Sequence, residues 1–165
     1  MSDDDSMFDD LRRAVMPRVN VHPTAVVASS AQLGDDAAVG AFAVVGERVV
    51  IGKGCIIGNH SELRADCKLG DRVRLGSQCL LANGTVVGEG SHLSGNFTTC
   101  DKPDLHNPTI KRSATIGTWF KAGVRVTIMP GVTIGDYAEV GACSQVRHDI
   151  GDREVWFGNP ATKHR

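Results

Sequence analysis

The feature that most constrains this chain is a six-residue period of aliphatic side chains. From Val21 to Leu93, every sixth residue is Val, Ile or Leu, which makes thirteen positions without an exception. The count resumes at Ile110 and runs to Val146, where only Ala122 departs from a branched aliphatic residue. Apolar residues make up 41% of the chain, so a run of thirteen is not a chance event. A fixed short period indicates a repeat fold, and a period of six is typical of parallel β-helices.

The other positions of the hexad support the same interpretation. Glycine often follows the aliphatic residue directly, and the fourth residue after it is usually small or branched. This pattern predicts an all-β coil with three flat faces, in which one large and one small side chain per face point inward. We expect the glycines to supply backbone freedom at the bends and the coils to stack about 4.8 Å apart. An amphipathic helix would need a period of 3.6 residues, and a simple alternating strand a period of 2.

Composition excludes several classes of function. The formal net charge of −1 over 165 residues argues against binding to nucleic acid or to a charged membrane surface. The chain has no run of eighteen apolar residues that would predict a membrane span, and its acidic start does not resemble a signal peptide. Cys55, Cys67 and Cys79 fall on inward small positions, where we expect core packing in a reducing cytoplasm. Closely spaced Cys and His pairs are missing, so no metal is expected.

The repeat divides the chain into three parts. Residues 1–20 are predicted to be an N-terminal leader or a cap over the first coil, because an exposed strand edge needs a cover. Residues 21–146 are predicted to form the β-helix. Residues 147–165 are predicted to form a C-terminal cap and tail, with Trp156 and Phe157 covering the last coil.

An interruption at residues 94–109 breaks the period. Leu93 and Ile110 are 17 positions apart, which is one short of a full coil of eighteen. The segment is therefore either an irregular coil, with Phe97 and Leu105 pointing inward, or a projecting loop. Its Asp, Asn and Pro residues are turn formers, which favours the loop. Loops on rigid scaffolds often carry binding and catalytic groups.

The hexads and three later motifs resemble the left-handed β-helix (hexapeptide-repeat) acyltransferases. The motifs are PTIKRSATIG, IMPGVTIGDYAEVGACSQV and VWFGNPA, and the resemblance covers residues 21–162. Within this family, the chain is most similar to the acetyl-CoA-dependent enzymes that acetylate an amino group on a nucleotide-linked sugar. The resemblance implies a left-handed helix, a homotrimer, and acetyl-CoA bound between neighbouring chains along the C-terminal coils. It also implies direct acetyl transfer assisted by a general base.

The predicted function is therefore transfer of an acetyl group from acetyl-CoA to a nucleotide-linked amino sugar. Two alternatives remain open: an O-acetyltransferase acting on a sugar or antibiotic hydroxyl, and a non-catalytic β-helix scaffold. The intact GNPA ending and the interrupted coil favour catalysis, since a pure scaffold needs neither.

Three residues are candidates for the catalytic group. His106 lies in the interrupted segment, and its imidazole suits a base that works near neutral pH. His92 precedes the inward Leu93 and should point outward; the resemblance implies that it lies near acetyl-CoA. Asn83 stands where bacillosamine-type sugar N-acetyltransferases carry their catalytic histidine.

The remaining candidates are assigned to the two substrates. The predicted acceptor-binding residues are Asn96, Thr99 and Asp101. The resemblance assigns cationic side chains to the phosphates of CoA and a small-residue backbone to its pantetheine arm. These predicted cofactor residues are Lys111, Lys121, Arg125, Gly141, Ala142, Asn159 and Pro160.

Overall fold

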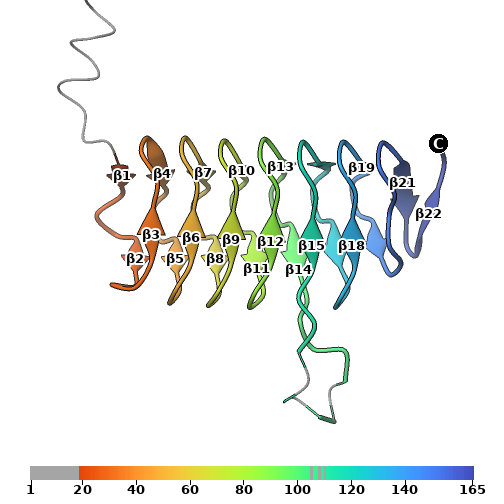
Figure 1. Ribbon diagram of the computed structural model, residues 1–165, viewed down its shortest axis with the longest axis horizontal. Coiled ribbons are helices and arrows are strands. Elements are labelled where there is room, and N and C mark those ends of the chain that lie inside the picture. The colour runs from red at the N-terminus through yellow and green to blue at the C-terminus, as the bar shows by residue number, and fades with distance from the viewer. Residues whose placement is uncertain (1–18, 105, 108, 110) are drawn as a thin grey trace, which may run out of the picture.

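Figure 1 shows the computed structural model of the chain, which describes residues 19–165 except 105, 108 and 110. The chain forms a left-handed parallel β-helix, which confirms the predicted fold class. Each coil contributes one short strand to each of three sheets, so the molecule is a triangular column (Figure 1). Within the described residues, no helix has the length and apolar character needed to span a bilayer.

The three sheets are the faces of the column, and we refer to them as faces A, B and C. Face A has nine strands: β1 (Val19–Val21), β4 (Ala37–Val39), β7 (Ile56–Ile57), β10 (Arg74–Leu75), β13 (His92–Leu93), β16 (Lys121–Ala122), β19 (Glu139–Val140), β21 (Val155–Gly158) and β22 (Ala161–Lys163). Face B has seven: β2 (Val26–Val27), β5 (Val44–Val45), β8 (Glu62–Leu63), β11 (Leu80–Leu81), β14 (Thr98–Thr99), β17 (Thr127–Ile128) and β20 (Gln145–Val146). Face C has six: β3 (Gln32–Leu33), β6 (Val50–Ile51), β9 (Lys68–Leu69), β12 (Val86–Val87), β15 (Thr115–Ile116) and β18 (Thr133–Ile134).

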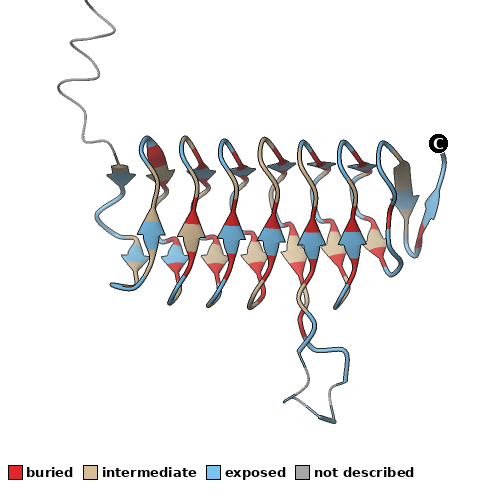
Figure 2. Cartoon of the chain, in the orientation of Figure 1, coloured by how far each residue is buried: buried red, intermediate tan, exposed pale blue. Residues whose placement is uncertain are grey.

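The predicted aliphatic stacks form inside the column. On face A, Val39 pairs with Ile57, and Ile57 pairs with Leu75. All three side chains are at most 2% exposed, and Figure 2 shows the buried residues recurring in the coils that follow the first one. The small inward positions are equally buried. Cys67 is one of them, and its burial raises the pKa of the thiol to about 11.

Two aromatic residues occupy inward positions that are small elsewhere. Phe97 and Phe120 are both fully buried, and their rings meet edge-on with centroids 6.4 Å apart. This pair acts as a bulky plug in two neighbouring coils. The two rings fill space in the interior that a small residue such as Ala or Val would not fill.

The prediction that the glycines supply backbone freedom at the bends was wrong. The bends are made by the residues two positions after these glycines, and most of those residues are not glycine. Arg48 and His60, for example, have φ values of 56° and 57°. The glycines after the aliphatic residues are required by close stacking instead. A Cβ atom on Gly58 would lie 2.4 Å from the carbonyl carbon of Gly76 in the next coil. A larger residue there would push the two coils apart.

The interruption of the column begins later than the expected residue 94. Strand β14 at Thr98–Thr99 pairs with β17 on face B in the regular register, and Phe97 points into the core. Ile116 follows Thr99 by 17 positions where one hexad takes 6, so eleven residues are extra. They form a loop that projects from the corner between faces B and C (Figure 1).

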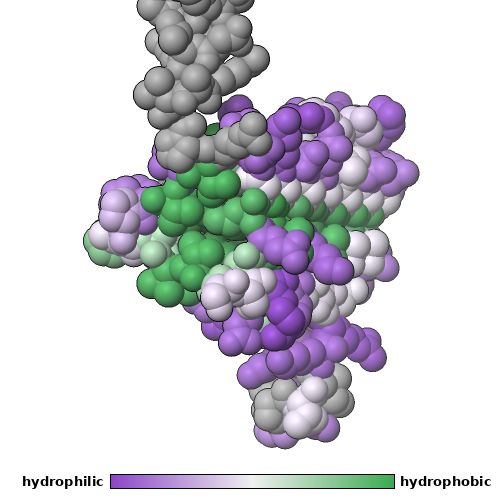
Figure 3. All heavy atoms as spheres, turned by 60° about the vertical axis from the view of Figure 1, so that its left-hand side comes forward, coloured by the Kyte–Doolittle hydropathy of each residue, from purple (hydrophilic) through white to green (hydrophobic). Residues whose placement is uncertain are grey.

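The two ends of the column differ. At the C-terminal end, β21 and β22 form an antiparallel hairpin, and Trp156 packs against the core. Phe157 is 45% exposed and does not cover the last coil as expected. At the N-terminal end, the inward side chains of the first coil are only partly buried, among them Val27 and Leu33. Figure 3 shows an apolar area at this end. The predicted cap at residues 1–20 falls almost entirely outside the described residues.

Candidate functional site

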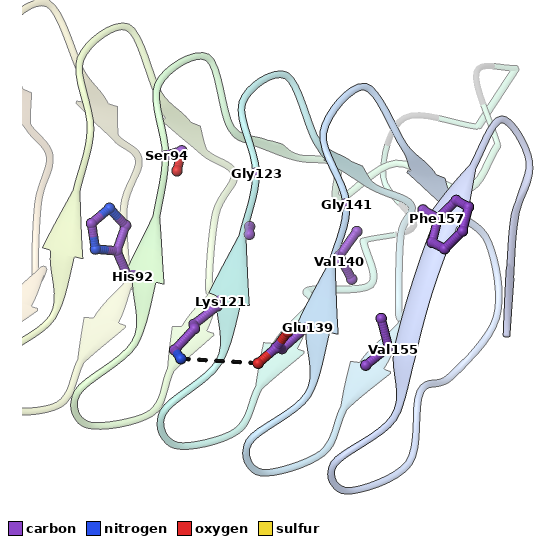
Figure 4. A pocket seen from close by; sticks show the side chains of 10 residues that line it. His92, Ser94, Lys121, Gly123, Glu139, Val140, Gly141, Val155 and Phe157 are labelled. Atoms are coloured by element: carbon purple, nitrogen blue, oxygen red, sulfur yellow. Dashed lines mark ion pairs between the residues drawn. The ribbon is translucent and has the colours of Figure 1, made fainter. Parts of the chain in front are cut away.

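A groove of about 380 Å³ runs along the C-terminal coils of face A. Its lining includes the outward side chains of four successive strands: His92 on β13, Lys121 on β16, Glu139 on β19 and Val155 on β21. These four residues are direct cross-strand partners, so they form one column across the sheet. Figure 4 shows them side by side along the groove.

The wall of the groove beside this column is backbone and one aromatic ring. Gly123 and Gly141 line it where the chain turns from face A towards face B. A Cβ atom on Gly123 would lie 2.5 Å from the nitrogen of Ala142, and one on Gly141 would lie 2.7 Å from the Cβ atom of Phe157. The coils therefore approach each other closely here and leave main-chain atoms accessible. The ring of Phe157 stacks on His164 with centroids 3.3 Å apart.

The charges in the groove are only loosely paired. The Nζ atom of Lys121 lies 3.9 Å from Oε1 of Glu139, and both side chains are exposed. An ion pair at this distance on a wet surface contributes little free energy. Lys121 can therefore exchange this partner for an anionic ligand at small cost.

The structure thus brings the catalytic candidate His92 together with two predicted cofactor residues, Lys121 and Gly141. The sequence interpretation missed Glu139 and Phe157. His92 and Lys121 are 29 positions apart, so they become neighbours only because eleven extra residues are added to one coil of eighteen. The separation of 29 positions was the one signal in the sequence that these residues are neighbours. It could be used only once the position of the loop was known.

A second pocket of about 470 Å³ lies on face B, at the base of the projecting loop. Asp101 lines it, is 4% exposed, and accepts a hydrogen bond on Oδ2 from Nδ2 of Asn83 at 2.8 Å. The carbonyl oxygen of Asn83 accepts a hydrogen bond from Oγ of Ser113 at 2.8 Å. The nitrogen of Arg112 donates to the carbonyl oxygen of Asp101 at 2.7 Å. These bonds close the loop at its base.

Thr99 also lines this pocket, although the residue is almost completely buried. It is 1% exposed, and its Oγ1 atom accepts a hydrogen bond from the nitrogen of Ala82 at 2.8 Å. Oγ1 also lies 2.9 Å from Oγ1 of Thr85. Thr99 occupies the large inward position of its hexad, and these partners satisfy its hydroxyl in the core.

The other predicted residues are spread over the column. Asn96 and Arg125 occupy equivalent bends between faces A and B, both with positive φ, and Ala142 adjoins Gly123 at the same corner. His106 is exposed in the loop, and its backbone nitrogen donates to Oδ1 of Asp104 at 2.8 Å.

The remaining cofactor candidates lie away from the groove lining. Lys111 is exposed near the end of the loop. It is close enough to Asp66 to contribute to the lowered pKa of that carboxyl, although the hydrogen bond from Arg48 is the main cause. Asn159 and Pro160 are exposed between β21 and β22.

No cluster of three or more His, Cys, Asp or Glu side chains in the described part of the chain has the arrangement of a metal site. His60, on an early coil, stacks on Phe42 with ring centroids 5.0 Å apart.

Comparisons with known proteins agree with this architecture. Residues 30–65 match the family described as bacterial transferase hexapeptide (six repeats). The chain is similar to a variant of GDP-perosamine N-acetyltransferase from Caulobacter crescentus, solved in complex with CoA and GDP-perosamine. The identity is 29% and the TM-score 0.61, over 98% of this chain and 63% of that one.

Two further structures are similar. The acetyltransferase domain of PglB from Neisseria gonorrhoeae is 25% identical over 97% of this chain and 64% of its own, with a TM-score of 0.56. It has also been solved with acetyl coenzyme A. A variant of the N-acyltransferase AntD from Bacillus cereus, with dTDP-4-amino-4,6-dideoxyglucose and coenzyme A, has a TM-score of 0.65 over 96% of this chain and 87% of its own. At 16% identity, this likeness shows the fold alone. The present chain spans less than two thirds of the length of the first two proteins.

Proposed function

The chain resembles the hexapeptide-repeat acyltransferases in both repeat and fold, and from this we propose that it is an acetyl-CoA-dependent N-acetyltransferase. The proposed acceptor is the amino group of a nucleotide-linked amino sugar. One observation carries the proposal. The groove on face A unites His92, Lys121 and Gly141 in a chain 29% identical to an enzyme solved with CoA and an amino-sugar nucleotide.

Acetyl-CoA lies along face A in this proposal. Lys121 and Arg125 are cationic and exposed, so they attract the phosphates of CoA. Gly123, Gly141 and Ala142 let the pantetheine arm approach the backbone closely, and its amides can then bond to main-chain groups. The acetyl end points towards His92.

The complete site requires a second copy of the chain. The groove is on face A, whereas the loop with His106 projects from the corner between faces B and C. In a homotrimer, the loop of one copy reaches the groove of the next. Large apolar side chains exposed on the early coils, including Val26, Phe42 and Val44, support burial against another copy. Lys111 reaches the cofactor only by this route.

The chemistry is a direct transfer. The amine nitrogen attacks the thioester carbonyl carbon, a C–N bond forms, and the C–S bond breaks as CoA leaves. The proton lost by nitrogen passes to a general base and then to the sulfur of the departing CoA. His106 is the proposed base; in the alternative, solvent takes the proton and Asn83 positions the reacting amine by hydrogen bonding. His92 contacts the acetyl-CoA thioester. A positioned base contributes about 100-fold or more to the rate.

The test is release of CoA thiol from acetyl-CoA in the presence of nucleotide-linked amino sugars. His106→Ala should lower kcat by about 100-fold or more without changing the KM for acetyl-CoA. His92→Ala should raise that KM. Absence of thiol release with every acceptor would favour the non-catalytic scaffold, and a preference for hydroxyl acceptors would favour an O-acetyltransferase.

A further inference from the structure

The pocket at the base of the loop contains a buried carboxylate that lacks a cationic partner. Asp101 is 4% exposed and makes no ion pair with any residue that the structure describes. Among the residues that the structure describes, its one side-chain hydrogen bond comes from Asn83, which is a neutral amide. A buried charge without a counter-charge is costly, and the cost falls when a cation binds. This part of the chain therefore suits a positively charged ligand group.

The free oxygen of this carboxylate is open to the pocket. Asn83 occupies Oδ2, and Oδ1 accepts no hydrogen bond from a described residue. Asp101 lines the pocket, and we infer that Oδ1 is the oxygen that a ligand in the pocket can reach. Asn83 holds the carboxylate in one orientation and leaves Oδ1 available to a ligand.

The rim of the same pocket carries the opposite charge. Arg64 and Lys102 both line it and both are exposed. The Nε atom of Arg64 donates a hydrogen bond to Oε1 of Glu62 at 3.1 Å. The terminal N–H groups of the guanidinium can therefore bind an anion. Between the buried carboxylate and this rim, Leu80 and Met129 give an apolar wall. A volume of about 470 Å³ lies in the range of small-molecule sites.

We propose that this pocket binds the acceptor as a zwitterion, with a primary ammonium on Asp101 and phosphate groups at Arg64 and Lys102. The inference rests on the proposed function and deepens it. It makes Asp101 the residue that selects an amine over a hydroxyl, and Asn83 the residue that positions its carboxylate. Because the loop extends from the same pocket, the bound amine lies beside the segment that carries His106.

The first experiment compares acceptors that differ by one group. GDP-perosamine and dTDP-4-amino-4,6-dideoxyglucose are each paired with the sugar nucleotide that has a hydroxyl in place of the amine. The amine of at least one pair should be acetylated with a kcat/KM about 100-fold or more above that of its hydroxyl twin. If no amine exceeds its twin, the proposal is overturned.

The second experiment changes the pocket. Asp101→Asn keeps the size of the side chain and should lower kcat/KM for the amine by about 100-fold, mainly through the KM of the acceptor. Asp35→Asn is the matched control, because Asp35 is exposed on an early coil, and its kinetics should stay unchanged. Arg64 is exposed, so Arg64→Gln should not disturb folding and tests the charged rim of the pocket by itself. It should raise the KM of the sugar nucleotide and leave that of the free amino sugar unchanged.

Calorimetric titration with CoA distinguishes failure of the acceptor pocket from failure of the proposed CoA-dependent function. Unchanged CoA affinity in Asp101→Asn and Arg64→Gln is expected, because CoA occupies face A. If Asp101→Asn folds and keeps amine kcat/KM within threefold of wild type, or if Arg64→Gln has no effect, the pocket is not the acceptor site. If the wild-type protein binds CoA but acetylates no amine, the acceptor assignment fails and the CoA groove stands. If it also fails to bind CoA, both proposals fail.

Discussion

Single residues decide what the interior of the column accepts. Every inward hydroxyl that the structure describes as buried has a hydrogen-bond partner. Ser61, for example, donates to the carbonyl oxygen of Gly76 at 2.9 Å and accepts from the nitrogen of Cys79 at 3.1 Å. A polar atom is tolerated inside only where the next coil provides such a partner, because an unsatisfied buried group costs free energy.

Leu63 has no such partner available for a charge. We expect Leu63→Asp to unfold the column, because it is 0% exposed and the change removes apolar burial while adding an unpaired carboxylate. The free energy of unfolding should fall by about 4 kcal/mol or more. Ile56→Asp is the matched control, since Ile56 is 46% exposed on a neighbouring strand. Thermal unfolding followed by circular dichroism measures both. A Leu63→Asp protein as stable as the control would contradict the stacked core.

At the scale of the elements, the C-terminal hairpin and the projecting loop are each held by a few identifiable bonds. Glu154, just before β21, accepts hydrogen bonds from Nζ of Lys163 at 2.6 Å, Nε1 of Trp156 at 2.8 Å and the nitrogen of Gly151 at 2.9 Å. The bond from Lys163 is the main cause that lowers the pKa of Glu154 from 4.5 to about 2. One side chain thus connects both strands of the hairpin to the preceding turn.

The lowered pKa of Glu154 predicts a pH-dependent contribution to stability. A carboxyl whose pKa falls on folding stabilises the folded state above its unfolded pKa, and this contribution is lost as the pH falls from about 4.5 towards about 2. Glu154→Gln should therefore lower the denaturation midpoint at pH 7. It should have little effect at pH 2, where the carboxyl is about half protonated in the folded protein and almost fully protonated in the unfolded chain. Urea titrations of both proteins at the two pH values make the comparison. An equal difference at both would show that the charge of Glu154 is not responsible.

The loop is an insertion into a complete coil, so its removal should spare the fold. Deleting residues 102–112 restores the hexad spacing, and Ser113→Gly supplies the residue that the bend with positive φ favours. We expect this variant to keep the β-sheet circular dichroism spectrum, to lose acetyl transfer, and to bind CoA more weakly because Lys111 is deleted with the loop. A variant that unfolds would show that the loop is part of the column. A variant that remains active would remove the loop, and His106 with it, from the site.

On the scale of the whole molecule, a single chain keeps the two halves of the proposed site apart. The groove with His92 lies on face A, and the pocket with Asp101 lies on face B. In the proposed function, a chain of 17.5 kDa therefore needs a neighbour to bring acetyl-CoA to the acceptor. Cyclic assemblies form such sites when one face of each copy meets a different face of the next.

Subunit mixing tests this arrangement directly. Assayed at an acetyl-CoA concentration well below the raised KM of His92→Ala, the His92→Ala and His106→Ala variants should each be nearly inactive alone. When they are co-expressed, a site that takes its groove from one copy and its loop from another carries both histidines in about a quarter of cases. Recovery of that share of wild-type activity is the expected result, with a mass by light scattering of about three chains. If mixing restores nothing, each site lies within one chain. A fully active monomer would likewise exclude the shared site.

The sequence by itself determined the coil, its inward stacks and the residue types of the groove. Each hexad carries its own pattern, and the direction in which a side chain points depends only on its place in that hexad. Thus Val39, Ile57 and Leu75 were recognisable as a stack, and His92 as an outward residue. Only the tertiary structure decided which residues meet across coils. The insertion begins after Asp101, and its length determines that Lys121 lies beside His92. The burial of Asp101 and the inward hydroxyl of Thr99 depend on partners in the previous coil, Asn83 and Ala82. A period describes one coil repeated, whereas a site is made by contacts between coils whose register an insertion shifts.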